Sequence, residues 1–163
     1  MHKHTLYTLA AVFIGGALVF TAFSSQDTAT SKTTVTKELE GTEITFYRSP
    51  TCGCCAGHAA ALEEAGAIVE MQNVDEVALQ NIKTENNIPF DKQSCHTAIV
   101  DNYVIEGHVP VAALAKFLEE KPETGGITLP GMPIGTPGMP GPQTEPYIVE
   151  TLEGEVFWRK DPS

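Results

Sequence analysis

The feature of the sequence that most constrains the fold is an alternation of strand-like and helix-like segments after residue 42. Residues 44–47 are β-branched or aromatic, as in a strand that ends with Arg48, and residues 56–65 are rich in strong helix formers and are followed by a glycine. Residues 68–74 repeat the strand pattern, and Asp75 can cap a second helix. Alternating strands and helices of this length predict a small α/β sheet flanked by helices.

The second half of the chain continues the alternation and then changes in composition. Two short strands with a two-residue turn between them are predicted at residues 97–100 and 103–106, and a helix at residues 111–118. Residues 125–142 contain six glycines and five prolines, which disfavours any regular helix or strand. Residues 147–151 and 155–160 predict a terminal β-hairpin. We therefore expect a domain at 43–121, a Gly/Pro/Met loop at 122–142 and a C-terminal hairpin extension at 143–163.

The first 24 residues predict export. A positively charged start leads into an apolar run of eighteen residues, Leu6 to Phe23, and small residues surround its end. We expect a cleaved signal peptide or, because the run is almost long enough to span a bilayer, an N-terminal membrane anchor. Residues 26–37 are rich in threonine and serine with almost no apolar side chain, so residues 25–42 are expected to form a flexible linker.

The charge of the chain excludes nucleic acid as a partner. The formal net charge is −11, and without residues 1–24 the chain keeps nine basic and twenty-one acidic residues, a formal charge of −12. A protein of this charge is repelled by a phosphate backbone. The acidic residues are scattered, as on an ordinary solvated surface, and carboxylates do not select soft metals.

Three cysteines lie at the junction between the first predicted strand and the first predicted helix. The C-x-x-C spacing of Cys52 and Cys55 suits a disulfide or a metal site, and a helix N-terminus favours the thiolate. A redox pair needs two thiols, whereas copper(I) takes two or three thiolates and shares them between ions, so Cys54 favours copper(I). A purely structural disulfide stays open as an alternative. Zinc is disfavoured because no second C-x-x-C or paired-histidine motif is present.

Three histidines are candidate additional ligands. His58 lies three residues after Cys55, on the same face of the predicted helix, although a surface role is the commoner one for such a histidine. His96 adjoins Cys95, and neighbours on a strand point to opposite faces, so both can bind only where the backbone is irregular. His108 precedes the third predicted helix, where a role in helix entry is equally open.

Two methionines, Met132 and Met139, occupy repeated Pro-Gly-Met-Pro segments of the loop. Their thioethers could bind a soft metal or could simply pack the loop. An extended chain would separate them by roughly 22 Å, so either the loop folds back or only one of them reaches a shared ion. A loop of this length without secondary structure is often functional, and a lid over the cysteines is one hypothesis.

The motifs together resemble a known family. A strand that ends in Tyr47-Arg48-Ser49-Pro50, followed by Cys52-Gly53-Cys54-Cys55 and a helix, is similar to the thioredoxin-like domain. With Ser94-Cys95-His96-Thr97, Gly107-His108-Val109-Pro110 and the Gly-Met-Pro loop, the chain resembles the CopG-type copper-resistance family, a domain of unknown function (411), over about residues 43–160. This resemblance implies a periplasmic protein whose cysteines bind copper, as a cluster of more than one ion, and for which an oxidoreductase role has been proposed.

The same resemblance predicts where Cys95 lies relative to the other cysteines. Thioredoxins have a cis-proline just before their third strand, facing the active thiols, and Cys95 occupies about that position in this chain. The resemblance therefore implies that Cys95 faces the other three cysteines and completes a four-sulfur site.

The sequence thus predicts a periplasmic copper(I)-binding protein that sequesters copper or passes it to other periplasmic copper-handling proteins, with the membrane involved only through an uncleaved N-terminal segment. The candidate ligands are Cys52, Cys54, Cys55, Cys95, Met132, Met139, His58, His96 and His108. The alternative is a thiol-disulfide oxidoreductase, with or without a link to copper, in which Cys52 attacks and Cys55 resolves the mixed disulfide.

Overall fold

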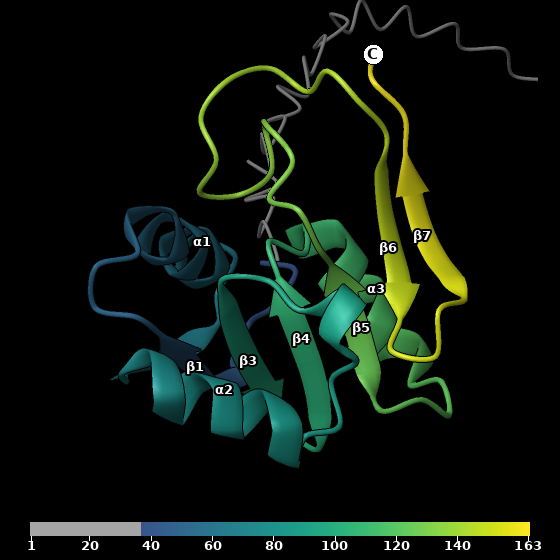
Figure 1. Cartoon of the computed structure of the whole chain (residues 1–163). Coiled ribbons are helices and arrows are strands. Elements are labelled where there is room, and N and C mark those ends of the chain that lie inside the picture. The colour runs from purple at the N-terminus through teal and green to yellow at the C-terminus, as the bar shows by residue number, and fades with distance from the viewer. Residues whose placement is uncertain (1–36) are drawn as a thin grey trace, which may run out of the picture. The chain divides into compact units, whose positions relative to one another are not determined.

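A computed structural model describes residues 37–163 of the chain. The elements in order are β1 (Glu43–Arg48), α1 (Gly53–Glu64), β2 (Ile68–Asn73), α2 (Glu76–Glu85), a 3-10 turn (Phe90–Lys92), β3 (His96–Val100), β4 (Tyr103–Gly107), α3 (Val111–Glu120), β5 (Gly126–Leu129), β6 (Tyr147–Thr151) and β7 (Val156–Lys160). The strands form one sheet in the order β2-β1-β3-β4-β5-β6-β7 (Figure 1). The predicted α/β class, with its sheet and flanking helices, is confirmed, and its thioredoxin-like character stays a prediction.

The two faces of the sheet are covered by different helices. Strand β1 pairs in parallel with β2 and antiparallel with β3, and β3 pairs antiparallel with β4 through the predicted turn at residues 101–102. Alternate strand residues such as Phe46 and Ile105 pack with α1 and α3 in the main hydrophobic core. The intervening residues, such as Thr97, face α2, which Figure 1 places on the opposite side of the strands.

The glycine- and proline-rich segment contains a strand that the sequence analysis excluded. Residues Gly126–Leu129 form β5, which pairs in parallel with β4. A side chain at position 126 would collide with the Val104 carbonyl, so this close approach requires glycine. The prediction of an irregular loop over 122–142 is therefore wrong for these four residues, because sheet pairing outweighed local composition.

The C-terminal hairpin, β6 and β7, continues the sheet. Strand β6 pairs antiparallel with β5 and with β7, with an irregularity at residues 149–150. The predicted hairpin strands are present, and they extend the same sheet instead of forming a separate attachment.

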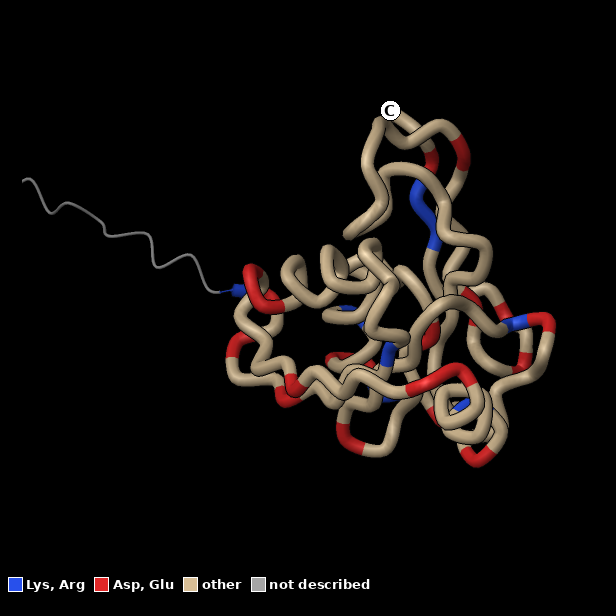
Figure 2. Tube along the Cα trace, turned by 60° about the vertical axis from the view of Figure 1, so that its left-hand side comes forward, with Lys and Arg blue, Asp and Glu red and all other residues tan. Residues whose placement is uncertain are grey.

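The expected linker ends earlier than residue 42. Leu39 is buried in the core, and its N–H donates to the Ala65 carbonyl at 2.9 Å, so these last residues are packed. The predicted signal or anchor at residues 1–24 and the linker up to residue 36 lie outside the described residues. Among residues 37–163, no helix has the length and apolar character needed to cross a membrane. Aspartate and glutamate residues are distributed over many loops and helices of the chain (Figure 2).

Candidate metal centre

The four cysteines of the chain meet at one end of the sheet. Cys52 is the N-cap of α1, Cys54 and Cys55 lie in its first turn, and Cys95 immediately precedes β3. The sulfurs of Cys52 and Cys54 are 3.5 Å apart, those of Cys55 and Cys95 are 3.6 Å apart, and all four lie within 4.8 Å of one another. Cys95 thus faces the other three, as the resemblance implied.

The start of α1 favours anionic sulfur. The first backbone N–H groups of a helix lack intrahelical partners, and together with the helix dipole they stabilise negative charge. No side chain caps this helix, and Arg48 donates from its guanidinium to the Cys52 carbonyl at 2.7 Å. Cys55 is buried, whereas Cys52 and Cys54 are partly exposed, so the sulfur group is open on one side.

Cys52 and Cys55 are joined by a disulfide, and Cys54 and Cys95 are free thiols. This is the oxidised form of the site. Two-electron reduction of the disulfide would give four thiols in the same place. A metal that needs thiolate ligands would bind the reduced form, so the oxidation state controls the number of available ligands.

Two histidines complete the group around Cys95. Its sulfur lies 3.3 Å from His96 Nδ1 and 3.2 Å from His108 Nε2, and both imidazoles are buried. His96 and Cys95 can face the same point because β3 begins at His96, which leaves Cys95 outside the regular strand. The irregular backbone that the sequence analysis required is present.

A chain of hydrogen bonds fixes which nitrogens are free. A carbonyl oxygen can only accept, so His58 Nε2–H donates to the Val109 carbonyl at 3.0 Å, and Nδ1 of the neutral ring is left as an acceptor. His96 Nε2–H donates to that atom at 2.8 Å, so His96 Nδ1 keeps its lone pair. His108 Nδ1–H donates to the Pro137 carbonyl at 2.8 Å, which leaves the Nε2 lone pair free. Both free lone pairs point toward Cys95.

His58 therefore differs from its prediction as a ligand. Both of its ring nitrogens are hydrogen-bonded, one to Val109 and one to His96. His58 therefore orients the candidate ligand His96 through a hydrogen bond. Its position on the same helix face as Cys55 was predicted correctly, but the packing of His96 against it was not visible from helix spacing alone.

All three imidazoles are held neutral. Burial, reinforced by the nearby His108, lowers the pKa of His58 to about 3. Burial also lowers the pKa of His96, with further contributions from neighbouring histidines and Lys83, and it lowers the pKa of His108. Neutral imidazoles are the metal-binding form.

The free Cys95 thiol resists ionisation. Burial, followed by the charge of the neighbouring Cys54, raises the pKa of Cys95 to about 11. At neutral pH this thiol carries its proton, so a metal must displace the proton on binding.

The Gly/Pro/Met loop lies against this centre through Pro137 and Gly138. The Pro137 carbonyl binds His108, and a side chain at Gly138 would clash with the Cys54 carbonyl and lie 2.6 Å from the His58 backbone nitrogen. Met139 follows directly, whereas the Met132 side chain is 40% exposed. Of the two candidate methionines, Met139 is adjacent to the contact that ties the loop to the centre.

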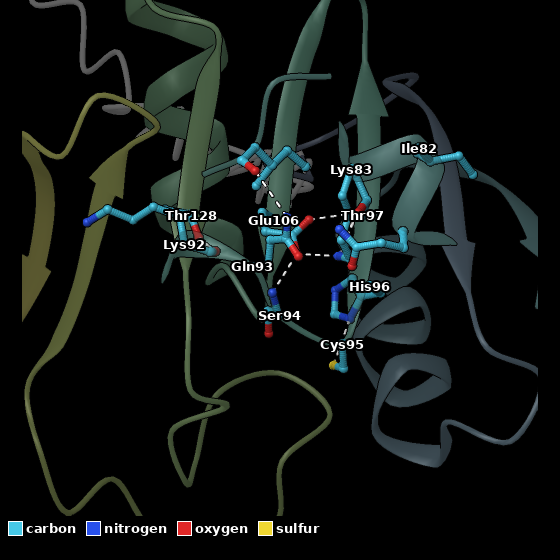
Figure 3. A network of polar contacts seen from close by, with 12 residues as sticks. Ile82, Lys83, Lys92, Gln93, Ser94, Cys95, His96, Thr97, Glu106 and Thr128 are labelled. Atoms are coloured by element: carbon cyan, nitrogen blue, oxygen red, sulfur yellow. Dashed lines mark hydrogen bonds and ion pairs between the residues drawn. The ribbon is translucent and has the colours of Figure 1, made fainter. Parts of the chain in front are cut away.

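Sequence reasoning missed a buried polar cluster that contacts Ser94, the residue before Cys95. Ser94 N–H donates to the buried carboxylate of Glu106 at 2.6 Å, and Lys83 and Thr97 contact the same carboxylate (Figure 3). A charged residue within the apolar pattern of residues 103–107 was a usable signal, because a buried charge requires partners.

The chemistry of the centre is that of a soft-metal site. Its donors are four sulfurs and two neutral imidazole nitrogens, and no carboxylate belongs to the group. Thiolates and imidazoles suit copper(I) and zinc, and they are poor ligands for magnesium or calcium.

Comparison with known proteins identifies the family to which the chain belongs. Residues 92–139 match the model of a family described as protein of unknown function, DUF411. No curated protein matches. Two solved structures, forms 1 and 2 of copper resistance protein CopG, are 33% and 34% identical, cover 75% and 74% of this chain and 99% of their own, and have TM-scores of 0.66 and 0.65. The chain belongs to the family of the copper resistance protein CopG.

Proposed function

We propose that this chain is a periplasmic protein that binds copper(I) through its cysteine group and contributes to copper resistance by sequestering or transferring the metal. The observation that carries the proposal is the convergence of four sulfurs within 4.8 Å of one another, with two imidazole lone pairs directed at Cys95. Soft thiolate ligands favour copper(I) over harder ions. The family relationship to copper resistance proteins supports the same metal.

The number of donors supports more than one ion. Copper(I) is satisfied by two or three thiolates and shares them between ions, whereas this centre offers four sulfurs and two nitrogens. A small copper cluster bridged by the cysteines uses this set more fully than one ion does. The exposure of Cys52, Cys54 and Cys95 leaves a side from which copper can enter or be passed to another periplasmic copper-handling protein.

The site's own residues have separate roles in this proposal. The α1 N-terminus favours the thiolates, and the two imidazoles are held neutral with a lone pair facing Cys95. Displacement of the Cys95 proton accompanies binding, because the pKa of this thiol is raised to about 11. Affinity should therefore increase with pH until Cys95 is ionised.

The test is an anaerobic titration of the fully reduced protein with copper(I) in competition with a chromophoric chelator. We expect more than one copper per chain, with a loss of affinity of about 10-fold or more in Cys95→Ser and loss of binding after oxidation of Cys52 and Cys55 to the disulfide. Met139→Leu should weaken binding less, and Met71→Leu, an exposed methionine of β2, is its matched control. Zinc bound as tightly as copper(I), or copper binding unchanged in Cys95→Ser, would contradict the proposal.

A second candidate function is supported by the Cys52–Cys55 disulfide. A C-x-x-C disulfide at a helix N-terminus is the arrangement of a thiol-disulfide oxidoreductase, in which Cys52 is the exposed attacking thiol and Cys55 resolves the mixed disulfide. A disulfide-reduction assay in parallel separates the two functions. Turnover that survives Cys95→Ser but not Cys52→Ser would favour the oxidoreductase, because that chemistry does not need Cys95.

A further inference from the structure

A buried ion pair lies behind the cysteine group, on the α2 face of the sheet. Glu106 of β4 is fully buried, and Lys83 of α2 is 4% exposed and contacts its carboxylate. Thr97 Oγ1–H donates to the second carboxylate oxygen at 2.7 Å, and Lys83 Nζ donates to the same hydroxyl at 3.0 Å. The buried carboxylate is therefore paired with a cation and hydrogen-bonded (Figure 3).

The same carboxylate holds the residue that precedes Cys95. Ser94 N–H donates to Glu106 Oε1 at 2.6 Å. Gly107, next to Glu106, packs closely against Ser94, because a Cβ added at this glycine would lie 2.8 Å from both Ser94 Cβ and Oγ. The end of β4 thus fixes Ser94 on two sides.

Cys95 depends on such support more than the other cysteines do. Cys52, Cys54 and Cys55 are placed by the first turn of α1, whose backbone hydrogen bonds define their spacing. Cys95 lies in the connection between the 3-10 turn and β3, where no helix or strand hydrogen bond orders it directly. Its sulfur nevertheless lies 3.6 Å from that of Cys55, across 40 positions of the chain.

We propose that Glu106 is a positioning residue for Cys95, which acts by holding the Ser94 N–H and is kept in place by Lys83. The ion pair is then part of the metal centre's support, although it touches no candidate ligand. The consequence for copper rests on the proposed function, but the positioning itself can be measured without metal.

The test compares two double variants that both lack the buried charges. Lys83→Met/Glu106→Gln keeps an oxygen that can accept from Ser94 N–H, and Lys83→Met/Glu106→Leu removes it. Replacing a buried ion pair with uncharged groups of similar volume is often neutral for stability, so both proteins should fold. The difference between them isolates the hydrogen bond to Ser94.

The readout is the equilibrium of the Cys55–Cys95 disulfide with oxidised and reduced glutathione, in a Cys52→Ser/Cys54→Ser background without metal. One oxidised glutathione and the two thiols give the protein disulfide and two reduced glutathiones, so the equilibrium constant reports how well the thiols are held together. We expect disulfide formation to be about 10-fold weaker in the Glu106→Leu double variant, which lacks the acceptor, than in the Glu106→Gln double variant. The Cys52–Cys55 disulfide, measured in a Cys54→Ser/Cys95→Ser background, is the control and should be unchanged.

Two results would overturn the proposal. Equal constants in the two double variants would mean that the hydrogen bond does not position Cys95. An equal decrease in both disulfides would mean general destabilisation.

Copper(I) titration then links the positioning residue to the metal. With all four cysteines present, the Glu106→Leu double variant should bind copper about 10- to 100-fold more weakly than its Glu106→Gln counterpart, as is typical for a lost supporting contact. The difference should disappear in a Cys95→Ser background. A selective disulfide effect without any copper binding in the unmodified protein would reject the proposed function and retain Glu106 as the positioning residue.

Discussion

Two polar clusters, one buried and one open on one side, lie on either side of the same part of the sheet, and they differ in how completely their hydrogen-bonding groups are used. On the α2 face, the Glu106 carboxylate receives donors from Lys83, Thr97 and Ser94. On the α1 side, the four sulfurs and two imidazole nitrogens lie close together. They have more lone pairs than there are hydrogen-bond donors among them. The Glu106 cluster therefore fills its own hydrogen-bonding groups, whereas the cysteine–histidine cluster keeps lone pairs that could bind a metal ion.

The remaining unpaired polar atoms fall near the second cluster. Within residues 37–163, the buried side-chain nitrogen and oxygen atoms without a hydrogen-bond partner are Arg48 Nε and Ser94 Oγ. Arg48 donates through its other guanidinium nitrogen to the Cys52 carbonyl, and Ser94 precedes Cys95. Substitutions in the two clusters test this difference, because they should change the free energy of unfolding by very different amounts.

The largest effect should come from breaking the satisfied cluster on one side only. Glu106→Leu alone leaves the Lys83 cation buried without its partner, which should lower the free energy of unfolding by about 3–5 kcal/mol. Adding Lys83→Met should recover most of this loss, because it removes the unpaired charge. Urea denaturation of the reduced, metal-free proteins measures both. If the single and double variants are equally stable, the two residues do not act as a pair.

A smaller loss is expected where the loop meets the centre. Gly138→Ala places a methyl group against the Cys54 carbonyl and the His58 backbone nitrogen, at a φ of +84°, and should cost about 1–3 kcal/mol. Gly131 has a φ of +83° with nothing within 4 Å, so Gly131→Ala carries the backbone strain without the contact. Denaturation of both variants separates the two effects. Equal losses would mean that the loop contact contributes nothing to stability.

The folded imidazoles should make the protein sensitive to mild acid. In the unfolded chain His58 binds a proton below about pH 6.5, whereas in the folded protein its pKa is about 3, so the unfolded state binds more protons between these values. Stability is therefore present above pH 6.5 and is lost as the pH falls toward 3, with a slope of about 1.4 kcal/mol per pH unit for this histidine.

His58→Gln tests this contribution because a glutamine can keep both hydrogen bonds without titrating. Between pH 7.5 and 5.5, the free energy of unfolding should decrease by about 1 kcal/mol less in His58→Gln than in the unmodified protein. The same loss in both proteins would mean that His58 does not resist protonation in the folded state.

The strand and helix pattern and the grouping of the cysteines could be predicted from the sequence, since both depend on local signals. Residues 44–48 and 56–65 contain their own periodicity, and the C-x-x-C spacing fixes Cys52 and Cys55 on one helical turn. The place of Cys95 came from a family resemblance, because nothing in its local sequence indicates a contact 40 positions away.

The parts that could not be predicted depend on tertiary contacts. Strand β5 forms in a glycine- and proline-rich segment because β4 offers a pairing edge. His58 supports His96 instead of joining the ligand set, since the orientation of the two rings is decided by the Val109 carbonyl. The support of Ser94 by Glu106 requires β4 to lie beside β3, which only the sheet order reveals.

The smallest effect on stability is expected within the cysteine group, although its effect on copper should be large. Cys54 is partly exposed in the first turn of α1, and in the reduced, metal-free protein Cys54→Ser should change the free energy of unfolding by no more than about 0.5 kcal/mol. Ala60→Ser, exposed on the same helix, is the matched control for stability and should leave copper binding unchanged. Copper(I) bound per chain should decrease in Cys54→Ser alone, because a ligand is lost that the fold does not need. A large loss of stability in Cys54→Ser would instead assign its sulfur to the packing of the protein, and the contrast between a satisfied support and an unsatisfied site would fail at this residue.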